Sequence, residues 1–141
     1  EPIFADGTDE PAPGKAINPA NPWARFVQQA VARYKPGGTM GLNIRYWEVW
    51  NEPDLCQFWS GTVAEYARLL KVAYLVIKQN DPQATVIWGG LAHFEQGTFL
   101  TDLVNILKSG PMAARYNGFF DAVYVPVVSG SSGGGAEGGE R

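Results

Sequence analysis

The stretch IRYWEVWNEPD, residues 44–54, gives the strongest structural signal in this chain of 141 residues. Its first seven residues are rich in aromatic and β-branched side chains, which favour an extended strand. Asn51-Glu52-Pro53 then ends that strand. The sequence therefore predicts a strand over residues 44–50, with a glutamate directly after its C-terminal end.

Helical and extended segments alternate on both sides of this strand. Caps, apolar spacing and turn residues predict three helices: from Asn21-Pro22 to Pro36, from the Thr62/Glu65 capping box to Asp81, and over about Thr98–Lys108. Two further strands are predicted over Ala84–Trp88 and about Phe119–Val125. Such alternation implies an α/β fold with parallel strands. Three strands leave two architectures open: a small open sheet, or part of a closed barrel, which needs about 250 residues.

Composition divides the chain into three parts. Residues 1–20 form a Pro/Gly-rich loop, residues 21–128 hold the predicted elements, and residues 129–141 form a Gly/Ser-rich tail that we expect to be flexible. The chain begins at Glu1-Pro2 without a signal-peptide pattern, which suggests a mature N-terminus or an excised piece. The compartment, extracellular or cytoplasmic, stays open.

Charge and composition exclude several classes of function. A net charge of -3 without clusters of Lys or Arg argues against nucleic-acid binding. No apolar run approaches the roughly 20 residues of a membrane span. The single histidine, His93, argues against a multi-histidine metal site, and the glycine pairs lack the spacing of a phosphate loop. We therefore expect no metal and no cofactor.

The position of Glu52 points to chemistry. Enzymes built on α/β barrels keep their active sites at the C-terminal ends of parallel strands. Strand alternation places Glu48, Trp50 and Glu52 on one face, unless a bulge intervenes. Trp50 and Pro53 flank Glu52 and are expected to desolvate it partly, which suits a glutamate to donate a proton. The alternative is a glutamate in a solvated loop.

The run from Tyr46 to Asp54 resembles the Asn-Glu-Pro motif of retaining glycoside hydrolases of clan A, at the end of their fourth barrel strand. It is most similar to β-xylosidase- and cellulase-like members. Phe58-Trp59, Asp81-Pro82 and Gly89-Gly90 extend the resemblance, which spans roughly residues 23–121. It implies a partial (β/α)8 TIM barrel containing about strands 4 to 6 with their helices, and a hydrolase that acts on a β-linked glycan or glycoside.

The resemblance also assigns roles. Glu52 would be the general acid/base, which protonates the leaving oxygen and then deprotonates the attacking water. Asn51 would bind the sugar 2-hydroxyl, Trp50 would shape the wall of the site, and His93 is a candidate for lining the pocket. Glu48 is expected to form a buried ion pair that supports the strand.

This chain departs from the family at the second carboxylate. The family's nucleophile is a glutamate at the end of the seventh strand, whereas Glu137 and Glu140 lie in the Gly-rich tail. We therefore expect a fragment that is inactive alone. Two other readings remain: a non-catalytic carbohydrate-binding remnant, or a structural piece that self-associates through open barrel edges.

Overall fold

The computed structural model describes residues 1–93, 97–110 and 112–124. Its elements follow the order α1 (Pro22–Tyr34), β1 (Tyr46–Val49), α2 (Val63–Asn80), β2 (Thr85–Trp88), α3 (Phe99–Lys108), a short 3-10 helix η1 (Asn117–Phe119) and β3 (Ala122–Val123). The strands form one parallel sheet in the order β1-β2-β3. The predicted α/β class and parallel pairing are confirmed.

The helix starts follow from their caps. The Asn21 side chain accepts a hydrogen bond from the N–H of Ala24 at 3.0 Å, at the start of α1. At the start of α2, Thr62 Oγ1 accepts from the N–H of Glu65, and Glu65 Oε2 accepts from the N–H of Thr62. Both bonds satisfy N–H groups that have no partner within the helix, so the predicted capping box is confirmed.

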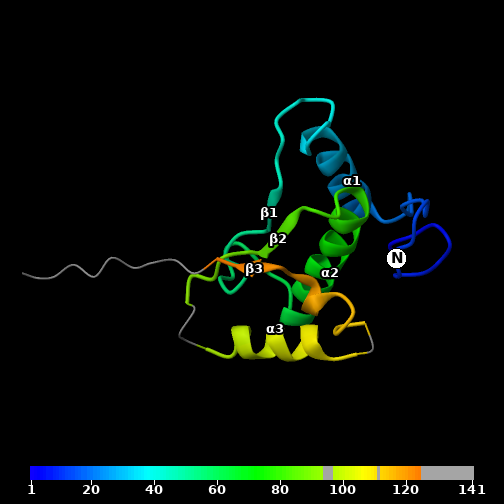
Figure 1. Ribbon diagram of the computed structural model, residues 1–141. Coiled ribbons are helices and arrows are strands. Elements are labelled where there is room, and N and C mark those ends of the chain that lie inside the picture. Colours follow the sequence, from blue (N-terminus) through cyan, green and yellow to red (C-terminus); the bar gives the residue numbers. More distant parts are fainter. Residues whose placement is uncertain (94–96, 111, 125–141) are drawn as a thin grey trace, which may run out of the picture.

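The helices cover one face of the sheet. Figure 1 shows α2 next to the strands, α1 beyond it and α3 below, and α2 packs against both other helices. On the covered face Val49, Val86 and Trp88 are buried. On the other face Tyr46 and Glu48 are exposed, and no described element packs over them. The sheet therefore has one sealed face and one open face.

The N-terminal segment is part of the same core. Ile3 and Phe4 are fully buried, and Phe4 forms an antiparallel bridge with Ile17. Arg68 of α2 donates a hydrogen bond to the carbonyl of Glu1. Isolated apolar side chains thus anchor the predicted Pro/Gly-rich loop, residues 1–20, to the core.

Two predicted strands are too long. β1 ends at Val49, because Trp50 has a left-handed backbone with a φ of 74°. Phe119, predicted to begin the last strand, lies in η1 with a φ of 65°, and its ring packs edge-on against Tyr74. The predicted end of that strand at Val125 and the predicted tail lie outside the described residues. No helix in the described ranges has the length and apolarity to cross a membrane.

Candidate functional site

A buried tyrosine joins the ends of β1 and β2. The Tyr66 hydroxyl donates a hydrogen bond to the carbonyl of Val49 at 3.0 Å and accepts one from the N–H of Gly89 at 2.8 Å. Burial, with a smaller contribution from the charge of Glu48, raises the pKa of Tyr66 above its usual range, although the Gly89 bond opposes this. The protonated hydroxyl therefore holds the two strand ends together.

Beyond β1 the backbone turns sharply at Glu52. Trp50 and Glu52 have φ values of 74° and 41°, in the left-handed region that side chains rarely adopt. The N–H of Glu52 donates to the carbonyl of Gly90 at 2.9 Å, and Pro53 behind it is fully buried. The prediction that Glu48, Trp50 and Glu52 share one strand face is therefore wrong beyond Glu48.

Two glycines allow this close approach. A Cβ on Gly89 would lie 2.9 Å from the carbonyl oxygen of Trp50, and a Cβ on Gly90 would lie 2.6 Å from the ring of Tyr124. The N–H of Gly90 donates to Glu48 Oε1 at 2.9 Å. Glu48 is exposed and has no ion-pair partner among the described residues, so the predicted buried ion pair is wrong. The Glu48 carboxylate instead accepts a hydrogen bond from the loop that follows β2.

An open hollow lies beside this turn. It has a volume of about 530 Å³, and Glu48, Trp50, Asn51 and Phe58 line it. Trp50 is 42% exposed, its indole N–H donates to the carbonyl of Phe58 at 3.0 Å, and its ring meets Trp59 edge-on. The hollow thus offers aromatic surface, an amide and a carboxylate to a ligand.

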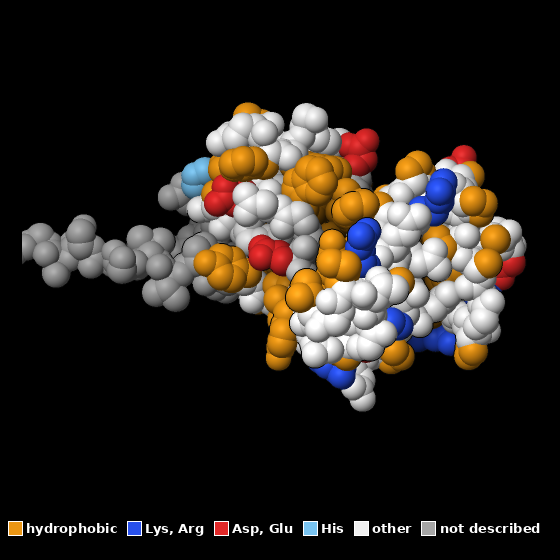
Figure 2. Space-filling model, turned by 90° about the horizontal axis from the view of Figure 1, so that it is seen from above, with side chains coloured by type: hydrophobic (Ala, Val, Ile, Leu, Met, Phe, Trp, Pro, Cys, Tyr) orange, Lys and Arg blue, Asp and Glu red, His pale blue; other side chains and the backbone are white. Residues whose placement is uncertain are grey.

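Glu52 stands next to this hollow in sequence but is not among the side chains that line it. It is half-buried, and its carboxylate has no hydrogen-bond or ion-pair partner among the described residues. In Figure 2 the histidine and several acidic side chains lie toward one end of the molecule, whereas the Lys and Arg side chains lie over the middle and the other end, where further acidic side chains also occur.

His93 follows β2 and is largely exposed, outside the lining of the hollow. Its Nδ1 lies 3.7 Å from Asp54 Oδ2. The Asp54 side chain, only 6% exposed, accepts hydrogen bonds from the N–H groups of Ala92 at 3.0 Å and His93 at 2.8 Å. Sequence reasoning missed Asp54 as a site residue, because its partners lie almost 40 positions away.

The other tryptophans serve packing. Trp88 is buried, with its ring 4.8 Å from that of Phe120. Trp59 is half-buried and meets Tyr66 edge-on. Among the described residues no three His, Cys, Asp or Glu side chains lie close enough to hold a metal ion.

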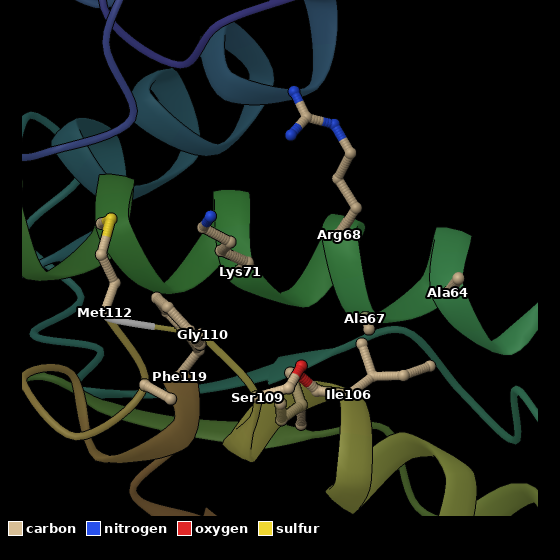
Figure 3. A pocket seen from close by; sticks show the side chains of 11 residues that line it. Ala64, Ala67, Arg68, Lys71, Ile106, Ser109, Gly110, Met112 and Phe119 are labelled. Atoms are coloured by element: carbon tan, nitrogen blue, oxygen red, sulfur yellow. The ribbon is translucent and has the colours of Figure 1, made fainter.

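A second hollow, of about 390 Å³, lies between α2 and α3 (Figure 3). Its lining is mainly apolar, with Ala67 and Ile106 among the contributors, and it includes no carboxylate. Figure 3 shows Arg68 and Lys71 directed away from the Ile106 side. Both cations lie within 4 Å of the Asp9 carboxylate, at 3.7 and 3.9 Å. This groove therefore lacks the acid–base groups found at the strand ends.

Comparison with known proteins supports a relation to glycoside hydrolases. The chain is similar to a β-xylosidase of Caldicellulosiruptor saccharolyticus, with 37% identity over 67 residues. The match covers 45% of this chain and 14% of that relative, so the chain spans only a small part of the curated protein it matches. No family model matches the chain, and no solved structure matches it.

Proposed function

We propose that this chain is the part of a retaining glycoside hydrolase of clan A that carries the general acid/base, Glu52. β1, β2 and β3 would then be about strands 4 to 6 of a (β/α)8 barrel. The observation that carries the proposal is the placement of a half-buried glutamate of an Asn-Glu-Pro segment directly after a parallel strand. The partial similarity to a β-xylosidase supports the coarser part of the proposal, a relation to glycoside hydrolases.

The proposed chemistry assigns one step to each group. Glu52 would protonate the leaving glycosidic oxygen, and its carboxylate would then deprotonate the water that attacks the glycosyl-enzyme. Asn51, which lines the open hollow, would bind the sugar 2-hydroxyl, and the exposed ring of Trp50 would face the sugar. The name of the relative favours β-xylosides as substrates.

A retaining mechanism needs a nucleophile about 5–5.5 Å from the acid/base. Glu137 and Glu140 lie outside the described residues, and the seventh strand of the proposed barrel would supply the nucleophile. We therefore propose that this chain alone does not turn over glycosides at an enzymatic rate. Hydrolysis of aryl xylosides by the purified chain, abolished by Glu52→Gln, would contradict this.

A chimera tests the assignment of Glu52. Residues 1–124 of this chain would replace the corresponding region of the Caldicellulosiruptor β-xylosidase, which supplies the remaining strands. We expect Glu52→Gln to lower kcat on xylobiose by about 10²- to 10⁴-fold, the usual contribution of a positioned acid/base. The matched control is Glu65→Gln, because glutamine also serves in a capping box. Equal activity of both variants would refute the proposal.

One observation favours a second candidate, carbohydrate binding without turnover. Trp50 and Phe58 expose 42% and 46% of their surface around the hollow, and aromatic faces are platforms for sugar rings. This candidate predicts binding of xylobiose by the chain alone, together with an inactive chimera. A structural role predicts neither sugar binding nor activity, but a stable oligomer.

A further inference from the structure

Three hydrogen bonds join residues 52–54 to the loop after β2. The first is the backbone bond from the N–H of Glu52 to the carbonyl of Gly90, at 2.9 Å. The other two end on the Asp54 carboxylate, which accepts from the N–H groups of Ala92 and His93 at 3.0 and 2.8 Å. Both oxygens of one side chain thus hold consecutive backbone groups of the neighbouring loop.

The surroundings of Asp54 make this contact specific. Its side chain is 6% exposed, and a buried polar group costs free energy unless it is hydrogen-bonded. Within the described residues these partners are the two N–H groups and the imidazole of His93, whose Nδ1 lies 3.7 Å from Oδ2. No Lys or Arg in the described ranges pairs with Asp54. The carboxylate is therefore committed to the loop that carries His93.

We propose that Asp54 is a positioning residue that fixes the loop after β2, and with it His93, at the edge of the sheet where Glu52 lies. The loop would then be a second wall of the sugar site, opposite the aromatic hollow. This last step rests on the proposed function. The carboxylate acts through His93 and the loop backbone, and touches no sugar itself.

The first test measures amide hydrogen exchange in the full chain. We expect Asp54→Ala to speed exchange of the Ala92 and His93 amides at least tenfold, because both lose their acceptor. Asp54→Asn keeps one carbonyl acceptor and should preserve protection of one of the two amides. Unchanged exchange at both amides in Asp54→Ala, or in Asp54→Asn if the alanine variant does not fold, would overturn the proposal.

A matched control separates positioning from general stability. Asp121 also accepts a backbone hydrogen bond, from the N–H of Val86 at 2.8 Å, and pairs with Lys78 at 2.7 Å. Asp121→Ala should speed exchange at Val86, which loses its acceptor, and leave the amides of Ala92 and His93 unchanged. Equal loosening of all three amides in both variants would show that Asp54 has a merely structural role.

The second test follows the ring signals of His93, which need no assignment because the chain has one histidine. We expect Asp54→Ala to shift them, and xylobiose to shift them in the parent chain and not in Asp54→Ala. Absence of any xylobiose effect in the parent chain would contradict a sugar wall at this loop, while amide exchange would still decide whether Asp54 holds it. The two experiments thus test the proposed sugar site and the proposed role of Asp54 separately.

Discussion

The two faces of the sheet differ in what their side chains do. On the helix-covered face Val86 and Trp88 expose at most 3% of their surface, whereas Tyr46 on the other face exposes 72%. The covered face continues into the core of α2, and the open face continues into the hollow beside Trp50. Stability is therefore concentrated on one side of the sheet, and the candidate chemistry lies at its open side and strand ends.

The largest effect should come from the covered side. Leu70 of α2 is fully buried, and Leu70→Ala should lower the free energy of unfolding by about 2–5 kcal/mol, through lost burial and a cavity. Leu42→Ala, at a side chain that is 59% exposed, should change it by less than about 0.5 kcal/mol. Urea titration of both variants measures the difference. Similar losses at the two positions would contradict the division into sealed and open sides.

A smaller loss should follow removal of the hydroxyl that joins the strand ends. Tyr66→Phe leaves the carbonyl of Val49 and the N–H of Gly89 without their partner, and each buried polar group left unpaired costs about 1–3 kcal/mol. We expect a net loss of about 2 kcal/mol in urea titration. A variant as stable as the parent would show that water or the neighbouring backbone replaces the hydroxyl.

Alkaline pH should destabilise the protein through a buried tyrosine of α2, Tyr74. Burial, with the charge of Asp121 and the proximity of Tyr116, raises the pKa of Tyr74 from 10.0 to about 12. A group whose pKa is raised by folding stabilises the native state below pH 10 and loses that contribution as the pH rises through about 12. Tyr74→Phe should therefore flatten the fall in melting temperature over this window. An equal fall in the parent chain and in Tyr74→Phe would contradict this prediction.

The open face should control association while leaving the stability of the fold almost unchanged. β1 and β3 are the edges of the described sheet, and unpaired parallel edges beside the exposed ring of Tyr46 favour pairing with another chain. We expect the chain to self-associate in sedimentation experiments, and Tyr46→Lys to weaken this. Met40→Lys, at an exposed loop position, is the control. A monodisperse parent chain would contradict the prediction.

The helices could be predicted from sequence because their signals are local. The caps at Asn21 and Thr62 act within three residues, and the structure forms both helices there. The parallel order of the strands also followed, because it depends only on alternation along the chain.

The strand ends could not be predicted, because contacts distant in sequence determine them. The left-handed turn at Trp50 and Glu52 depends on the small size of Gly89 and on the carbonyl of Gly90, almost 40 residues later. The partners of Asp54 lie equally far along the chain. The motif therefore indicated which residues form the candidate site, and the structure was needed to show what holds them.

The identity of Glu52 as acid/base is the central claim, and azide rescue of Glu52→Ala in the β-xylosidase chimera tests it most directly. With the proton donor removed, aryl xylosides with good leaving groups should still form the glycosyl-enzyme, which then accumulates because no base activates water. Azide needs no base and should release a xylosyl azide of retained configuration, identified by NMR. A xylosyl azide of inverted configuration would show that Glu52 is the nucleophile. An equal loss of activity on all substrates, with no azide product, would show that Glu52 has only a structural role. Either result would contradict the assignment of Glu52 as the acid/base.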